Sequence, residues 1–561
     1  MSEHFALTLV HTNENYYLPI QGTPTFVVDG LDESATLNNL VMSQASSHTA
    51  IQSDTRLAWK NQFGAHQVGV MGGVRYLNSA YKLTSQSGYN TPNDKAPKMN
   101  SSLSFKDTDG ANDKTSEFIW YALGNYNYAQ RYYVNAGISA HASSRFGKDA
   151  DGLKMAGVVW GLFPSVEAAW VISNESWFAG IKPINYLRLN VGFDVTGNDD
   201  IDYTASRSYF VSSRMLNSSA TGIAIGNIGN TELKWESTSR LTAGIEGNFF
   251  DNRLNLRFNY FKSWTSNLLS LQQLAWTSGL EANWSNEGKL ENSGFDAHAV
   301  VKVINLKDFR WELGASVGHY KNKVTALPDN NRSFETNLYG ATIQTKVDQP
   351  VGVFYGYKTN GVYSTSAEAA ANGKYLVKEN GDKLFFKAGD MNFVDQDGNG
   401  TIDEKDRTVI GDPNPDLYGN IHTTLSWKNL TLSAVFNYSL GNDIFNYQRS
   451  LLEGGTYFLN QTTAMKNRWT TEGQKTNYPR VEYKDPMGNA RFSDRWIEDG
   501  SYLRLSNITL SYYLPIQSTY LQGITIFGNV NNLFTITKYL GSDPDCGIAG
   551  GILTQGLANR K

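Results

Sequence analysis

The sequence has little cysteine, few charged residues and no long hydrophobic run. Cys546 is the one cysteine, which excludes an internal disulfide and a metal centre built from several thiolates. No run of about 18 apolar residues occurs, so a membrane-spanning helix is excluded. Charged residues make up 18%, below the ~25% of an average globular protein. The net charge of −4 argues against a nucleic-acid partner, which would require a basic surface.

Aromatic residues, in contrast, are abundant. They make up 13% of the chain, with 31 Tyr, 27 Phe and 13 Trp. A low charge content with many Tyr and Trp residues suits a surface that lies between lipid and water. Several of these residues are therefore expected in aromatic girdles at the membrane interfaces, although some could instead face the interior and stack on sugar rings. The candidates are Trp120, Tyr121, Trp160, Trp170 and Trp177.

Long stretches of the chain alternate between apolar and polar residues. Phe309, Trp311, Leu313, Ala315 and Val317, for example, are separated by single polar or small residues. Side chains on a β-strand point to opposite faces with a period of two, so one face is apolar and the other polar. The pattern recurs many times and helical periodicity is scarce, which predicts one very large antiparallel sheet. A sheet of this size needs closure, and an apolar outside with a watery inside is typical of a membrane β-barrel.

Short turns and long connections alternate between the predicted strands, as in barrels with small periplasmic turns and large outer loops. We expect about 14 to 16 strands of about ten residues, long enough to cross a bilayer at a tilt. A soluble β-sandwich with shorter strands, as in a secreted glycan-binding protein, is the alternative. Four hairpins are predicted, at 240–260 with the turn Phe250-Asp251-Asn252, at 295–320, at 421–438 with the turn Lys428-Asn429, and at 502–530 with a bulge near Asn507. The predicted long connections are 78–115, 197–235, 262–293, 321–420 and 439–501.

The sharpest local signal is the segment from Asp395 to Asp406, which has the spacing of a twelve-residue calcium loop. Gly400 occupies the sixth position, where such a loop turns sharply. Position twelve is Asp rather than Glu, which shortens the arm for bidentate binding. We predict a structural Ca²⁺ that rigidifies an outer loop, and the alternative is a solvated turn. The candidate ligands are Asp395, Asp397, Asn399, Thr401, Asp403 and Asp406.

Other candidate sites are sparse. Trp276 and Trp284 are candidate ligand contacts because both are expected in an outer loop. The eight His residues lack the spacing of metal ligands, and the sequence contains no nucleophile elbow or phosphate-cradling glycine run. The chain is therefore not expected to be an enzyme.

A series of short motifs appears in a fixed order from about residue 145 to 545. The motifs are GLFPS at 161–165 with AW at 169–170, YLRL at 186–189 with TGN at 196–198, LKWE at 233–236, NSGFD at 292–296, GNDIFN at 441–446, DGSYLRL at 499–505 and NNLFT at 531–535 with KY at 538–539 and DP at 543–544. In this order they resemble the SusC/RagA-type TonB-dependent transporters of the Gram-negative outer membrane.

The resemblance implies a 22-stranded barrel filled by an N-terminal plug, with energy delivered through the TonB complex. It also implies a SusD/RagB-like lipoprotein as a lid, a glycan or peptide as the ligand, and a wall surrounded by outer-membrane lipid. Residues 1–561 are expected to be the barrel domain without the plug, truncated at both ends, so that TonB would act through a plug region absent from this chain. No signal peptide is visible at Met1, and Phe26 to Gly30 echo a plug motif by coincidence. A passive porin remains a second alternative.

Overall fold

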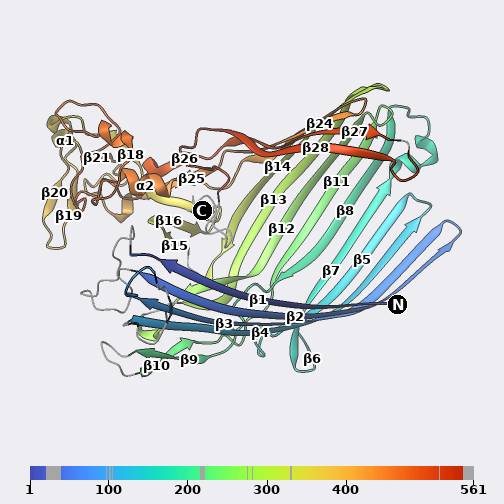
Figure 1. Cartoon of the computed structure of the whole chain (residues 1–561), viewed down its shortest axis with the longest axis horizontal. Coiled ribbons are helices and arrows are strands. Elements are labelled where there is room, and N and C mark those ends of the chain that lie inside the picture. The colour runs from blue at the N-terminus through green and yellow to red at the C-terminus, as the bar shows by residue number, and fades with distance from the viewer. Residues whose placement is uncertain are drawn as a thin grey trace. The chain divides into compact units, whose positions relative to one another are not determined.

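The computed structural model describes residues 1–561 except 21–38, 96–97, 100–102, 104, 215–220, 275, 281, 329–331, 517 and 547–561. The described chain consists mainly of long strands (Figure 1). The largest sheet contains, in spatial order, β1 (Ser2–Leu18), β2 (Leu40–Phe63), β3 (His66–Tyr89), β4 (Phe105–Tyr128), β5 (Tyr132–Ser143), β7 (Val158–Val171), β8 (Ile184–Asn198), β11 (Glu236–Phe249), β12 (Leu254–Gln273), β13 (Ala282–Asn305), β14 (Phe309–Ala326), β23 (Leu417–Trp427), β24 (Leu430–Leu440), β27 (Tyr502–Pro515) and β28 (Gly523–Thr537), with β6 (Leu153–Met155) paired to β7.

The spatial order of these strands follows their order in the chain, as in a meander of hairpins. The pairings from β1 to β5 and from β13 to β28 are antiparallel. Among the described residues, β1 and β28 each have a strand neighbour on one side only, so the sheet is not closed. The prediction of about 14 to 16 antiparallel strands is thereby confirmed.

The chain divides into two compact units. Unit 1 comprises Met1–Ala168, Gly192–Ser239 and Ser266–Glu287, and unit 2 comprises Ala169–Val191, Arg240–Thr265 and Gly288–Lys561. Unit 1 also contains the two-stranded sheet of β9 (Tyr209–Arg214) and β10 (Thr221–Asn227), within the predicted connection 197–235.

Several strands are longer than the sequence suggested. β2, β3, β4 and β13 each have 24 residues. The prediction that 78–115 and 262–293 are connections is therefore largely wrong, because β3, β4, β12 and β13 occupy most of both segments. These segments are rich in Asn, Ser and Gly, which usually favour turns, but strand formation depends on the neighbouring strand as much as on propensity.

The predicted turns are confirmed in their backbone geometry. Phe250, Asp251 and Asn252 have φ angles of 54°, 56° and 58°, and Lys428 has a φ of 51°. These are left-handed conformations, which Asp and Asn tolerate better than most residues. The register of β27 against β28 shifts between Leu505 and Asn507, which confirms the predicted bulge.

The connections 327–416 and 441–501 fold together into one structure within unit 2, here called the loop module. Figure 1 shows its elements gathered beyond one end of β24, β27 and β28. Its elements are β15 (Ser333–Leu338), β16 (Ala341–Lys346), β17 (Val353–Tyr357), β18 (Thr359–Val362), α1 (Ser366–Asn372), β19 (Tyr375–Val377), β20 (Lys383–Phe385), β21 (Met391–Phe393), η5 (Glu404–Asp406), β22 (Arg407–Gly411), β25 (Asp443–Phe445), α2 (Tyr447–Glu453), η6 (Thr463–Asn467), η7 (Asp494–Trp496) and β26 (Ile497–Asp499).

Two hydrophobic clusters hold the loop module together, and each combines both connections. In one cluster Met487 packs with Phe393, and in the other Phe354 packs with Phe445 and Trp496. All five side chains are buried. The interpretation of these segments as plain loops is therefore incomplete, because a buried core formed from both connections positions their backbone.

Candidate functional site

The long sheet separates apolar from polar side chains row by row. Residues directly opposite each other on antiparallel strands lie on the same face. From β13 to β28, one such row consists of Ala299, Ala315, Ile421, Phe436, Leu505 and Phe534. The adjacent row, on the other face, consists of His298, Ser316, Asn420, Asn437, Arg504 and Thr535. In unit 2 the sheet thus has one apolar and one polar face.

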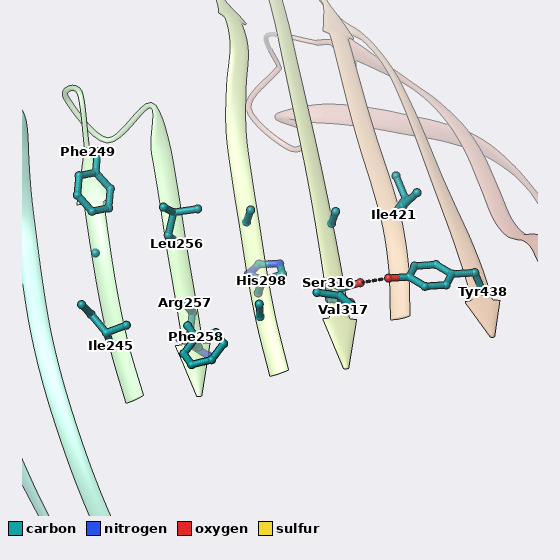
Figure 2. A pocket seen from close by; sticks show the side chains of 14 residues that line it. Ile245, Phe249, Leu256, Arg257, Phe258, His298, Ser316, Val317, Ile421 and Tyr438 are labelled. Carbon is teal, nitrogen blue, oxygen red and sulfur yellow. Dashed lines mark hydrogen bonds between the residues drawn. The ribbon is translucent and has the colours of Figure 1, made fainter. Parts of the chain in front are cut away.

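A shallow hollow of about 500 Å³ lies on the apolar face of unit 2 (Figure 2). Ile245, Leu256, Phe258 and Ile421 contribute apolar side chains from β11, β12 and β23. Beside it, the hydroxyl of Tyr438 donates to the backbone carbonyl of Ser316 at 2.9 Å. The lining of the hollow is mainly hydrocarbon, which suits a hydrocarbon chain better than a polar ligand.

The polar face of unit 1 carries two ion-pair networks. In the first, Arg75 donates to Asp54 through Nε at 3.0 Å and Nη2 at 2.7 Å, and the hydroxyl of Tyr121 donates to the same carboxylate at 2.6 Å. In the second, Nη1 of Arg145 lies 3.1 Å from Glu117 and 2.9 Å from Asp199. The partners in these networks lie 21 to 67 residues apart in the sequence, so sequence analysis missed both networks.

The aromatic residues predicted for the girdles are placed in different ways. Trp120 and Trp177 are exposed, at 47% and 62%. Trp160 is buried, and Nε1 of Trp170 donates to Glu175 at 3.1 Å. Tyr121 faces the polar side, because its hydroxyl reaches Asp54, so a girdle position is wrong for this residue.

The segment from Asp395 to Asp406 forms a compact loop within the loop module. Asp395 accepts hydrogen bonds from the backbone amides of Gly398 at 2.8 Å and Gly400 at 2.7 Å. Gly400 has a φ of 83°, a left-handed conformation that glycine adopts without strain. Although burial opposes the change, these amide hydrogen bonds hold the pKa of Asp395 below its ordinary value.

The structure brings together three of the six predicted calcium ligands. One carboxylate oxygen from each of Asp395, Asp397 and Asp406 lies within 4.8 Å of the other two. Asp406 is fully buried and accepts from the amides of Gln396 at 2.7 Å and Asp403 at 2.8 Å. A small set of converging carboxylate oxygens is the donor type that Ca²⁺ prefers.

The other three predicted ligands make bonds within the loop. Asn399 accepts from the amide of Thr401 at 2.6 Å through its side-chain oxygen. Asp403 accepts from the amide of Lys405 at 2.8 Å and caps η5. Ile402 helps to anchor the loop, because it is buried in a core cluster and its amide donates to the backbone carbonyl of Tyr375 at 2.9 Å. The amide of Tyr375 in turn donates to the carbonyl of Gly400 at 3.1 Å.

The two candidate ligand-binding tryptophans lie on different elements. Trp276 begins the short helix η3 (Trp276–Ser278) between β12 and β13, as a connecting residue should. Trp284 lies on β13, so its prediction as a loop residue is wrong. It packs, partly buried, against a small cluster of Ile201, Ala205 and Leu233.

No helix in the described part of the chain has the length and apolar content required to span a membrane. The segment Phe26 to Gly30, whose likeness to a plug motif is expected to be a coincidence, lies outside the described residues.

Comparison with protein-family models identifies the architecture. The model named TonB dependent receptor-like, beta-barrel matches residues 4–533. The chain belongs to this family. It is therefore an outer-membrane β-barrel protein of a receptor and transporter family, which confirms the resemblance, the fold class and the location predicted from the sequence.

Relatives of known name agree with this assignment. TonB-dependent receptor P3 of Formosa agariphila is 29% identical over 512 residues, which cover 88% of this chain and 48% of the relative. TonB-dependent receptor SusC of Bacteroides thetaiotaomicron is 27% identical over 434 residues, covering 75% and 40%. The chain spans about half the length of the curated relatives it matches.

Among solved structures, the RagAB peptide transporter superposes with a TM-score of 0.78 at 21% identity. The match covers 98% of this chain and 57% of that chain. The RagAB peptide importer in its closed-closed state gives a TM-score of 0.77 at 22% identity. At this identity the comparisons establish a shared fold, in which an apolar face contacts lipid and a polar face lines the barrel interior.

Proposed function

We propose that this chain forms part of the wall of a TonB-dependent importer that takes up glycans or oligopeptides across the outer membrane. The observation that carries the proposal is the family match over residues 4–533. The fold shared with the RagAB peptide transporter supports an oligopeptide as one candidate ligand. The motifs that resemble SusC/RagA-type transporters support a glycan as the other.

In this proposal the polar rows form the aqueous side of the import path. Their hydroxyl, amide and charged groups hydrate the interior, while the backbone hydrogen bonds of the strands remain satisfied within the wall. A ligand binds first between the outer loops and a SusD/RagB-like lipoprotein lid. Pulling by the TonB complex on a plug region, which we predict to lie outside this chain, then opens the path.

An uptake measurement in the source bacterium tests this function. Deletion of the gene should abolish uptake of a labelled glycan or oligopeptide pool, and a plasmid copy should restore it. Because TonB transmits energy from the inner membrane, a proton-motive-force uncoupler should also stop uptake. A passive porin predicts uptake that continues with the uncoupler, and that result would contradict the proposal.

We propose in addition that the loop 395–406 binds one structural Ca²⁺. The convergence of Asp395, Asp397 and Asp406 within 4.8 Å supports this, as does the sharp turn at Gly400. The ion would hold the outer part of the loop module rigid above the barrel. The full proposed ligand set is Asp395, Asp397, Asn399, Thr401, Asp403 and Asp406.

Calorimetric titration of the purified chain with CaCl₂ tests the ion site. Asp395→Ala and Asp397→Asn should remove the calcium-dependent heat. Asp382→Ala is the matched control, because Asp382 lies in a turn of the same module and bonds to Asn380 instead. Absence of calcium heat in the unmodified chain, or its survival in both loop variants, would refute the site.

A further inference from the structure

A second hollow, of about 340 Å³, lies on the polar face of unit 1. Strands β2, β3, β4, β5 and β7 all contribute to it, so it is part of the barrel wall and not of a loop. Charged, hydrogen-bonding and aromatic side chains meet in it. Those that matter for its chemistry are Asp54, Arg56, Arg75, Tyr121, His141 and Phe163.

The carboxylate of Asp54 is already fully engaged. It is 9% exposed, and it accepts two hydrogen bonds from Arg75 and one from Tyr121. Gly73 makes room for the ring of Tyr121, because a Cβ atom at position 73 would overlap this ring. The arrangement pairs Asp54 with Arg75 and gives each of its two carboxylate oxygens a hydrogen-bond donor.

Arg56 lies beside this pair and is attracted by Asp54, but the ion pair and the hydrogen bonds of Asp54 go to Arg75 and Tyr121. It is opposite Gly73 on β3, while Asp54 is opposite Arg75, so the two arginines are diagonal neighbours on one face, ~7–8 Å apart at the backbone. Arg56 is exposed, and its Nε donates to the hydroxyl of Ser2 at 2.9 Å. In the described chain no carboxylate forms an ion pair with it. Among the residues that line the hollow, two guanidinium groups and one carboxylate leave one positive charge in excess, while Asp199 acts on His141 from outside the lining.

The remaining lining offers a rigid, largely apolar floor. The rings of His141 and Phe163 meet edge to face with centroids 4.9 Å apart. His141 is also held by Ser139, whose hydroxyl lies 3.0 Å from Nε2. Rings fixed in this way can contact the carbon skeleton of a ligand without losing much conformational freedom on binding.

From this geometry we infer that the hollow binds the carboxylate of a ligand passing along the barrel interior, with Arg56 as the principal contact. A guanidinium group matches a carboxylate through two parallel hydrogen bonds, and the excess positive charge favours an anion over a neutral group. The carboxylate can belong to a sugar acid in a glycan or to the C-terminus of a peptide. The inference rests on the proposed import function and adds a preference for acidic substrates.

Equilibrium binding to the purified full chain in detergent tests the inference. Two acidic probes, trigalacturonate and trialanine, are compared with neutralised forms, the methyl ester of trigalacturonate and the C-terminal amide of trialanine. Both sources of carboxylate are thereby tested separately. Binding of one acid shows which source the hollow accepts, and binding of both shows that the carboxylate alone is recognised.

Two variants of Arg56 and one control variant test whether Arg56 contacts the carboxylate. Arg56→Gln should weaken binding of the acid about tenfold or more, because a hydrogen bond to a charged group is lost. Arg56→Lys should retain part of the affinity, since the charge remains. Arg310→Gln should leave binding unchanged, because Arg310 is an exposed arginine on the polar face of β14 in unit 2.

Three results would overturn the inference. They are equal affinity for the acids and their neutral forms, equal affinity of the Arg56→Gln and unmodified chains, and no binding of either acid to the folded chain. The import function is tested by a different measurement, uptake in cells, so its failure can be distinguished from failure of the binding site. Carboxylate binding without any uptake defect in the deletion strain would remove the import proposal and leave the binding site.

Discussion

At the scale of single residues, the loop module contains a buried carboxylate that several donors surround. Asp390 is fully buried, and its charge is compensated by three donors. Nε of Arg480 lies 2.7 Å from it, Nδ2 of Asn489 3.0 Å, and the amide of Lys387 2.8 Å. The ion pair of Asp390 and Arg480 joins the connection 327–416 to the connection 441–501, so the stability of the module is sensitive to changes at these two residues.

Arg480→Met should destabilise the loop module by about 3 kcal/mol, because it leaves a buried carboxylate without its cation. Urea unfolding followed by tryptophan fluorescence would measure the loss, since Trp469 and Trp496 lie in this region. Lys475→Met, on the same connection, is the control and should change the unfolding free energy little. Equal stability of the two variants would show that the ion pair does not stabilise the module.

The pKa of Asp395 gives a prediction on pH. Its folded pKa is lowered by the amides of Gly400 and Gly398 against the effect of burial. The resulting stabilisation is present above the unfolded value of ~3.9 and is lost as pH falls through the lower folded value. Hydrogen exchange should therefore show that the loop of Asp395→Asn opens more readily than the unmodified loop at pH 6, and that the difference narrows near pH 3. A difference that does not depend on pH would contradict this explanation.

At the scale of the strand, small residues determine where large side chains fit on the sheet. Gly314 on β14 lies opposite His422 on β23, and a Cβ atom at this position would overlap the imidazole ring. On β28 the situation differs, because nothing lies within 4 Å of a Cβ atom added to Gly528. The two glycines therefore form a matched pair of strand positions, one crowded and one open.

Gly314→Val should reduce the yield of folded barrel, because His422 must leave its rotamer or the strands must separate locally. Gly528→Val should fold normally, and its β-branched side chain suits a strand. Heat-modifiable migration in gel electrophoresis, which separates folded from unfolded barrels, would measure both variants. Similar folded fractions for the two would argue that the crowding at Gly314 is relieved easily.

At the scale of the whole molecule, the decisive property is the apolar face of the sheet. Trp427 and Ile526 lie in one row of this face and are each 59% exposed, and the row from Ala299 to Phe534 is apolar throughout. Such a surface is stable only against lipid or detergent. The soluble β-sandwich considered from the sequence is thereby replaced by a partial barrel of the TonB-dependent receptor family.

The purified chain should therefore remain monodisperse in detergent and aggregate when detergent is diluted below its critical micelle concentration. Size-exclusion chromatography with light scattering would measure this directly. A monodisperse, folded chain without detergent would contradict the membrane assignment of the apolar face.

The sequence by itself determined the class of the protein and much of its local structure. Alternation with a period of two shows which side chains share a face, and the turns at Asp251 and Lys428 follow from local backbone preference. The sequence also predicts the calcium-type loop, because its candidate ligands lie within twelve consecutive residues. The assignment of residues 1–561 to the barrel domain alone stays a prediction.

Only the tertiary structure decided which residues of neighbouring strands lie opposite each other. The pairing of Asp54 with Arg75 and Tyr121 depends on the register of three strands, and a shift of one residue would move each side chain to the other face. The core of the loop module likewise joins Phe354 to Trp496, which are distant in the chain. Local periodicity carries no information on these long-range pairings, because it is identical for every register that keeps the same face turned inward.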